Sequence, residues 1–136
     1  MEPRQRNNRA LILAVERDPH VRELEAYFLT EAGCDVEFTS DGATALERTR
    51  ELRPDIVITE VLVPKLDGLA LCRALKADPL TRDTIVLVFS ILAAATRAKE
   101  AGADAFLQKP LGEHRLVETV RQLLLQRDSP ATQGEP

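Results

Sequence analysis

Residues 10–19 read ALILAVERDP, and the arrangement of the whole chain can be inferred outward from them. Residues 10–15 form an unbroken apolar run, which is typical of a parallel strand buried on both faces rather than of an alternating, half-exposed strand. Asp18 can cap a following helix, and Pro19 suits the first helical position, where a backbone N–H would lack a partner in any case. The stretch therefore predicts a buried strand that passes directly into a helix.

The same strand-to-helix unit recurs along the rest of the chain. Further strands are expected at about 36–39, 56–59, 85–89 and 105–107, and helices at about 19–32, 42–52, 66–77, 93–101 and 113–126. Strict alternation with short connections requires parallel strands joined by right-handed crossovers. We therefore expect an α/β fold, a flavodoxin-like doubly wound five-stranded parallel sheet in the order 2-1-3-4-5 with five helices.

A chain of 136 residues is near the usual size of one domain. We expect a folded domain over residues 10–126, a flexible N-terminal arm at 1–9 and a flexible C-terminal tail at 127–136, because the two end segments lack an apolar period.

Composition argues against several classes of function. The net charge of −4 disfavours a main role in binding nucleic acid. The longest uncharged run, residues 84–96, is shorter than the ~20 apolar residues that a membrane span needs, and the polar N-terminus does not resemble a signal peptide. Cys34 and Cys72 lack the spacing of a metal or redox pair. We expect a cytoplasmic protein that binds neither nucleic acid nor membrane.

Residues 53–68 read RPDIVITEVLVPKLDG, which resembles the third strand and following loop of the receiver domains of two-component response regulators. Further matches are ERDP at 16–19, Ser90 after the fourth strand, and AGADAF at 101–106 leading to Lys109 before Pro110. The resemblance covers residue 10 to about residue 125. It implies a non-enzymatic signalling module rather than an enzyme.

The resemblance also implies a site at the carboxyl ends of the strands. In the family, two acidic residues after the first strand and an aspartate after the third hold a divalent cation, and that aspartate accepts the phosphoryl group. A Ser or Thr after the fourth strand and a Lys before Pro contact the phosphoryl group, and an aromatic residue precedes that Lys. The matching positions are Glu16 and Arg17, Glu60, and Ser90, Phe106 and Lys109.

Two of these positions depart from the family pattern. Glu60 stands where the phosphoaccepting aspartate is expected, and Arg17 stands at an acidic position. Glu60 carries its carboxylate one methylene further from the backbone, and a guanidinium both removes a ligand and repels a cation. We expect the Mg²⁺ site to be lost, with no cofactor or metal. Two arrangements of Arg17 are open: an ion pair with Glu60, or a solvated side chain at the mouth of the crevice, since exposed ion pairs contribute only ~0–1 kcal/mol.

Two smaller departures lie after the fourth strand. Ile91 follows Ser90 where receivers usually have a small residue, so we expect its side chain to cover the pocket. The segment from Ser90 to Gly102 is shorter than is usual in receivers, which predicts a trimmed fourth helix or entry loop.

The sequence thus favours a single-domain pseudo-receiver, a phosphorylation-independent protein-interaction module in phosphorelay-type signalling. Its expected partner is a protein, such as a histidine kinase or a downstream effector, and Glu60 is a candidate mimic of the phosphorylated state. One alternative is a conventional phosphoacceptor that uses an unusual carboxylate, such as Asp18 or Glu60. Another is a flavodoxin-like cofactor binder, although the chain has no glycine-rich phosphate loop, one Tyr and no Trp.

Overall fold

A computed structural model describes residues 9–110 and 112–128. All strand pairs of its sheet are parallel, and the order is β2-β1-β3-β4-β5, which confirms the predicted fold. The strands are β1 (Ala10–Val15), β2 (Cys34–Thr39), β3 (Ile56–Thr59), β4 (Ile85–Ser90) and β5 (Ala105–Gln108). The helices are α1 (Pro19–Glu31), α2 (Gly42–Leu52), α3 (Gly68–Ala77), α4 (Ala95–Glu100) and α5 (Glu113–Asp128).

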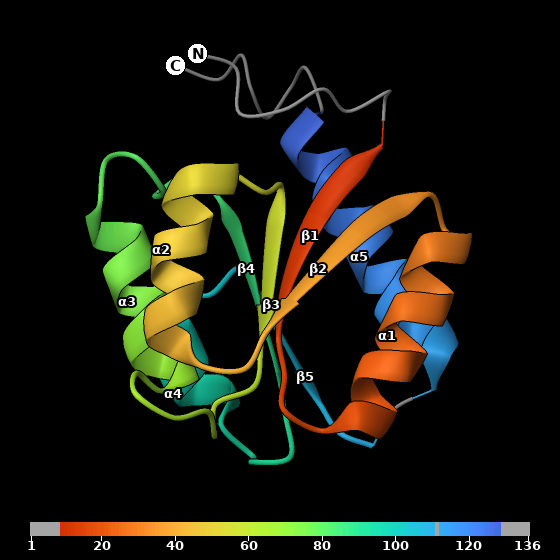
Figure 1. The fold of residues 1–136 in the computed structure, drawn as a ribbon, viewed down its shortest axis with the longest axis horizontal. Helices are drawn as coiled ribbons and strands as arrows, with labels where there is room; N and C mark the ends of the chain where they lie inside the picture. The colour runs from red at the N-terminus through yellow and green to blue at the C-terminus, as the bar shows by residue number, and fades with distance from the viewer. Residues whose placement is uncertain (1–8, 111, 129–136) are drawn as a thin grey trace.

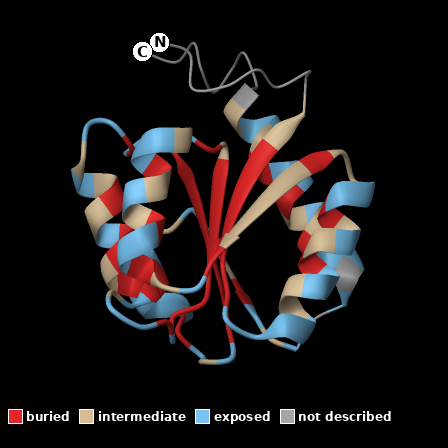
Figure 2. Cartoon of the chain, viewed as in Figure 1, coloured by how far each residue is buried: buried red, intermediate tan, exposed pale blue. Residues whose placement is uncertain are grey.

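The helices form a layer on each side of the sheet (Figure 1). α1 and α5 cover one face, and α2, α3 and α4 cover the other. Buried residues of the central strands alternate between the two faces, so that Leu13 and Val15 join the core under α2 to α4, whereas Ile12 and Ile58 join the core under α1 and α5. The sheet is therefore the buried middle layer of the domain (Figure 2).

The strand register brings the carboxyl ends of the strands to one edge of the sheet. Val15 at the end of β1 pairs with Thr59 at the end of β3, and Thr59 pairs with Val88 in β4. Ser90 at the end of β4 pairs with Gln108 at the end of β5. Side chains that follow these strands consequently lie close together, as is usual for ligand sites in doubly wound sheets.

Side-chain caps begin three of the helices, as residue type predicts. Asp18 accepts a hydrogen bond from the backbone N of His20, at 2.8 Å, and Pro19 occupies the first position of α1. Asp41 accepts from the N of Thr44 at 2.7 Å, and Asp67 begins α3 in the same way. These caps set the point at which each loop after a strand ends.

Some element bounds differ from the sequence-based expectation. α3 begins at Gly68 instead of near Leu66, because the loop before it turns through a left-handed Lys65, with φ of 72°. α4 comprises only 6 residues and has no side-chain cap, in agreement with a trimmed fourth helix. α5 extends to Asp128, beyond the expected end at Gln126.

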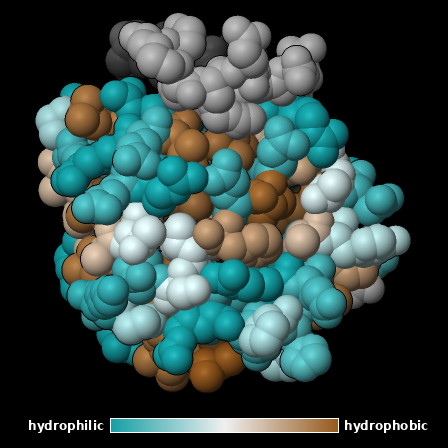
Figure 3. Space-filling view, viewed as in Figure 1, coloured by the Kyte–Doolittle hydropathy of each residue, from teal (hydrophilic) through white to brown (hydrophobic). Residues whose placement is uncertain are grey.

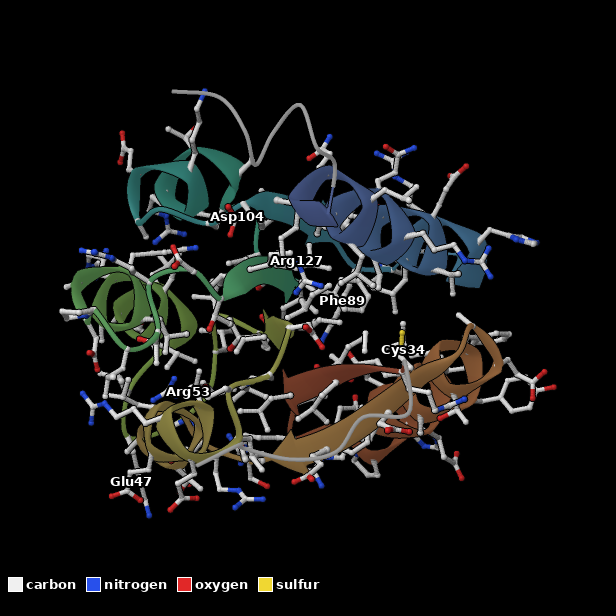
Figure 4. The ribbon with its side chains drawn as sticks, turned by 90° about the horizontal axis from the view of Figure 1, so that it is seen from above. Cys34, Glu47, Arg53, Phe89, Asp104 and Arg127 are labelled. Atoms are coloured by element: carbon white, nitrogen blue, oxygen red, sulfur yellow. The ribbon has the colours of Figure 1, made fainter. Side chains whose placement is uncertain are left out.

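The ends of the described chain are tied to the domain. Arg9, expected in the flexible arm, bonds Asp35 at 2.8 Å, and Arg127, expected in the tail, bonds Asp55 at 2.7 Å. In Figure 4 the Arg127 side chain points from α5 in toward the body of the domain. The remainder of the predicted arm and tail, residues 1–8 and 129–136, lies outside the described residues. Within the described part of the chain, no helix is long and apolar enough to cross a membrane.

Candidate functional site

Side chains from four strand ends meet at the carboxyl edge of the sheet. Glu16 follows β1, Glu60 follows β3, Ser90 ends β4 and Lys109 follows β5. The backbone extends the sheet into these positions, since the N of Glu60 bonds the O of Val15 at 3.1 Å and the N of Lys109 bonds the O of Ser90 at 2.8 Å. The parallel sheet thus brings together four of the six site residues that the sequence predicted.

Lys109 bridges the two glutamates. Its Nζ lies 2.7 Å from Oε1 of Glu16 and 2.9 Å from Oε1 of Glu60. The Lys109 side chain is 10% exposed, and those of Glu16 and Glu60 are 6% and 8% exposed. The three formal charges leave the cluster with one net negative charge, in surroundings that screen charge less than bulk water does.

The Glu60 carboxylate has further hydrogen-bond donors. Oε2 accepts from the Ser90 hydroxyl and, at 2.9 Å, from the backbone N of Val61. Oε1 accepts from the backbone N of Ile91 at 3.3 Å. The N of Leu92 donates to Ser90 Oγ at 3.1 Å, which leaves the hydroxyl proton of Ser90 to point at Glu60.

These contacts set the ionisation of the cluster. Burial raises the pKa of Glu60, but hydrogen bonds from Ser90 and Lys109, together with the Lys109 charge, outweigh burial and hold that pKa below its usual value. Burial lowers the pKa of Lys109, but its hydrogen bonds to Glu16 and Glu60 and their charges raise it above its usual value. Glu60 and Lys109 are therefore both charged at neutral pH.

The predicted ion pair between Arg17 and Glu60 is wrong. The Arg17 residue is exposed, and it forms no ion pair with any residue in the described ranges 9–110 and 112–128. Lys109 holds the position beside the Glu60 carboxylate that Arg17 was expected to hold. To pair with the buried Glu60, Arg17 would have to leave solvent, and the desolvation of a buried ion pair can exceed the gain from its attraction.

Two further predictions concern Phe106 and the side chain of Ile91. Phe106 in β5 is half-buried and packs against the core under α2 to α4. Ile91 donates its backbone N–H to Glu60, while its side chain is 58% exposed and lines a neighbouring cavity instead of enclosing the carboxylate. In Figure 3 polar side chains cover much of the visible face, and apolar ones show across its middle and again at its lower edge, where Figure 1 draws the loops after the strands.

The fold and the cluster together match a known family. Residues 12–121 match the family model of the response regulator receiver domain. The chain belongs to this family. The receiver fold accounts for the meeting of Glu16, Glu60, Ser90 and Lys109 at one edge of the sheet.

Solved structures and curated proteins agree with this family. A putative response regulator from Chloroflexus aurantiacus superposes with a TM-score of 0.82 at 32% identity, covering 86% of this chain and 98% of that one. The receiver domain of a histidine kinase from Syntrophus aciditrophicus superposes with a TM-score of 0.82 at 36% identity, covering 88% and 93%. The DNA-binding response regulator MtrA of Mycolicibacterium smegmatis is 35% identical in an alignment of 132 positions, which covers 90% of this chain and 54% of MtrA. The chain thus spans about half the length of such a curated relative.

The side chains present do not fit the Mg²⁺ that the receiver family implies. Mg²⁺ requires oxygen ligands in near-octahedral geometry. Here Oε1 of Glu16 and Oε1 of Glu60 both face the Lys109 ammonium, and Arg17 offers no oxygen. Within the described residues, no three His, Cys, Asp or Glu side chains lie close enough to share a metal ion.

Sequence reasoning missed one acidic residue near this cluster. Leu24 and Tyr27 are among the apolar residues that recur at three- and four-residue spacing along α1, a pattern typical of a buried face, but their side chains are 59% and 61% exposed. Glu25 is buried in their place, at 1% exposure, together with Leu29. The four-residue spacing of Val21, Glu25 and Leu29 was the available signal, but a glutamate on a helix is ordinarily read as solvent-facing.

Proposed function

We propose that this receiver domain is a pseudo-receiver, which acts in two-component signalling as a protein-interaction module whose state does not depend on phosphorylation. The observation that carries the proposal is the set of donors around the Glu60 carboxylate. Ser90 and Lys109 occupy the positions at which receivers contact a phosphoryl group, and here both donate to Glu60. The Glu60 carboxylate therefore accepts the hydrogen bonds that Ser90 and Lys109 would otherwise donate to a phosphoryl group.

Charge supports the same proposal. A transferring phosphoryl group develops negative charge that a metal ion neutralises in receivers and other phosphotransfer sites. In this cluster the cation beside Glu60 is Lys109, which is covalently part of the chain and also bonds Glu16. An incoming phosphoryl group would have to compete with Glu60 for Ser90 and Lys109. Among the residues that the structure describes, it would find no third carboxylate to hold its metal.

Glu60 is then a built-in substitute for the phosphorylated state. Arg17 points into solvent, so the charge on Glu60 is offset by Lys109, the residue that contacts the phosphoryl group in the family. The contacts of Ser90 and Lys109 are permanently made. The domain therefore presents one signalling surface continuously, to a protein partner such as a histidine kinase or a downstream effector.

DNA binding is part of the names of two relatives and is said of those proteins alone. MtrA and the RpaA protein of Synechocystis are DNA-binding regulators by name, and the chain matches 54% and 50% of their lengths. The shared part is the receiver domain, so a protein partner is the interaction that the matched residues support.

Titration with Mg²⁺ and beryllium fluoride tests the proposal. Backbone amide spectra should show no saturable shifts at Glu16, Glu60, Ser90 or Lys109 at millimolar ligand. Saturable shifts at these positions would overturn the proposal and restore a conventional switch. A parallel incubation with a radiolabelled small phosphodonor should give no label that is stable at neutral pH and released by hydroxylamine.

Partner binding tests the mimic separately. Replacing Glu60 with Ala removes the carboxylate that accepts from Ser90 and Lys109, and leaves Lys109 bonded to Glu16 alone. We expect binding to the physiological protein partner to weaken at least tenfold, whereas Glu51→Ala, an exposed glutamate on α2, should leave it unchanged. Equal binding by Glu60→Ala and the unmodified protein would remove the mimic from the proposal.

A further inference from the structure

A cavity lies beside the charged cluster, between α1, α5 and the ends of β4 and β5. Its volume is about 320 Å³, within the lower part of the range of small-molecule sites. Its walls are apolar and consist mainly of Val21, Leu24, Phe28, Phe89, Ile91 and Leu116. Phe89 lies between the sheet and the layer of α1 and α5 (Figure 4).

Two ionisable side chains also line this cavity, Glu25 and Lys109. Glu25 is 1% exposed, and its Oε1 is buried without a hydrogen-bond partner among the described residues. Buried polar side-chain atoms in native proteins nearly always have a partner, so an orphaned carboxyl oxygen at a cavity wall requires an explanation.

The cations near Glu25 are engaged elsewhere. Lys109 bonds Glu16 and Glu60, and Arg22 donates to the backbone O of Glu16 and to Ser40. Burial, followed by the charge of Glu16, raises the pKa of Glu25 to about 8, while Lys109 and Arg22 lower it and Glu60 raises it further. An ionised Glu25 carboxylate at the cavity wall would therefore have no cation bonded to it among the described residues.

We propose that the cavity binds a small molecule with an apolar body and a primary ammonium group, and that the ammonium pairs with Glu25. The apolar walls match the body of such a ligand, and charge complementarity selects the ammonium. Binding would supply the donor that Oε1 of Glu25 lacks. This site is separate from the phosphoryl-type contacts of Glu60 and does not depend on the function proposed above.

The location gives such a ligand a route to the signalling cluster. Lys109 lines the cavity and bonds Glu16 and Glu60, and Ile91 lines the cavity and donates its backbone N–H to Glu60. A bound ammonium beside Glu25 adds positive charge near Lys109. The ligand therefore acts on the cluster through residues that belong to both.

The first test uses 2-phenylethylamine as the probe and 2-phenylethanol as its uncharged match. Amide spectra of the full chain should show saturable shifts at Val21, Phe28, Ile91 and Leu116 with the amine. We expect the amine to bind at least tenfold tighter than the alcohol. No saturable shift at these positions at millimolar amine, or equal affinity of amine and alcohol, would overturn the proposal.

Proton linkage provides an independent readout. At pH 7 a group with a pKa of about 8 is mostly protonated, and pairing with an ammonium requires the carboxylate. Calorimetry in buffers of different ionisation enthalpy should therefore show release of close to one proton per bound amine at pH 7, and almost none at pH 9, where Glu25 is already mostly ionised and the amine is still mostly protonated. Binding without proton release at pH 7 would contradict a pair with Glu25.

Variants of α1 complete the test. Glu25→Gln keeps the size of the side chain and removes its charge, so the amine should lose at least tenfold in affinity and the proton release should vanish. Glu23→Gln, on the exposed side of the same helix, should bind the amine as the unmodified protein does.

The shape of the cavity is tested separately. Leu24→Trp narrows the cavity from an exposed position and should also weaken amine binding, whereas Leu80→Trp, at a residue that does not line the cavity, should not. Unchanged amine binding by Glu25→Gln or by Leu24→Trp would overturn the proposal.

Discussion

The Nζ of Lys109 lies 2.9 Å from Oε1 of Glu60. Lys109 follows β5 and Glu60 follows β3, 49 positions earlier in the chain. The same ammonium bonds Glu16 after β1, so one side chain joins three strands of the sheet. The pair is nearly enclosed, and removal of either partner leaves a buried charge without compensation. The cluster is consequently a determinant of stability as well as of signalling chemistry.

Lys109→Met should destabilise the domain by about 3 kcal/mol, because Glu16 and Glu60 then face one another without a cation. Urea unfolding at pH 7 measures the change. Lys99→Met, an exposed lysine on α4, serves as the control and should shift stability by less than about 0.5 kcal/mol. A loss for Lys109→Met no larger than that of the control would mean that the bridge contributes little.

The lowered pKa of Glu60 predicts a specific acid sensitivity. A carboxyl whose folded pKa lies below its unfolded value contributes stability above the unfolded pKa, and this contribution is lost as pH falls through the folded pKa. The stability difference between the unmodified protein and Glu60→Gln should therefore be constant near pH 7 and should shrink as pH falls below about 4.5. Urea midpoints at a series of pH values measure it. A difference that does not change with pH would contradict the shift.

Strand alternation allowed most of the fold to be predicted. The apolar run at 10–15 and the residues Asp18 and Pro19 predicted β1 and the start of α1 because strand burial and helix capping are local properties of the sequence. The start of α3 was placed too early, since the left-handed turn at Lys65 depends on how the loop packs, which residue types alone do not specify.

The members of the site were predictable, but their pairing was not. The parallel sheet and the family resemblance together predict that Glu16, Glu60, Ser90 and Lys109 lie at one edge of the sheet, as they do in the structure. Whether Arg17 or Lys109 pairs with Glu60 depends on the direction in which each side chain leaves the backbone after its strand, which residue type does not specify. Arg17 and Glu16 are adjacent in the chain, yet one is exposed and the other buried.

Glu25 predicts an unusual dependence of stability on pH. Its pKa is raised to about 8 from 4.5, so the folded state retains a proton that the unfolded state has lost, and stability falls as pH rises between these values. The expected loss between pH 6 and pH 8 is about 2 kcal/mol. Glu25→Gln should lack this loss, whereas Glu23→Gln should retain it, as measured by urea unfolding at each pH. Parallel pH profiles for all three proteins would be inconsistent with a buried protonated Glu25.

Gly68 permits the close approach of α3 to the Glu60 backbone. A Cβ at this position would lie 2.3 Å from the O of Glu60 and 2.9 Å from the Cα of Val61. Gly68→Ala should therefore destabilise the domain by about 1–3 kcal/mol and shift the amide resonances of Glu60 and Val61. Gly112→Ala is the matched control, because a Cβ there meets nothing within 4 Å. Equal effects of the two substitutions would show that the approach tolerates a methyl group.

Reversion of the two departures from the receiver pattern should restore phosphotransfer. Glu60→Asp withdraws the carboxylate by one methylene from Ser90 and Lys109. Arg17→Asp adds an oxygen ligand and removes a positive charge. Together the two changes provide space and negative charge for Mg²⁺. Arg17→Asp alone should change stability by less than about 0.5 kcal/mol, because Arg17 is exposed. We expect the double variant to bind Mg²⁺ and to incorporate label from a small phosphodonor. Each single variant should incorporate much less label, because Arg17→Asp alone lacks the aspartate acceptor and Glu60→Asp alone lacks the third metal ligand. Label on the unmodified protein at the level of the double variant would mean that Glu60 does not block the chemistry and that the acceptor is another carboxylate.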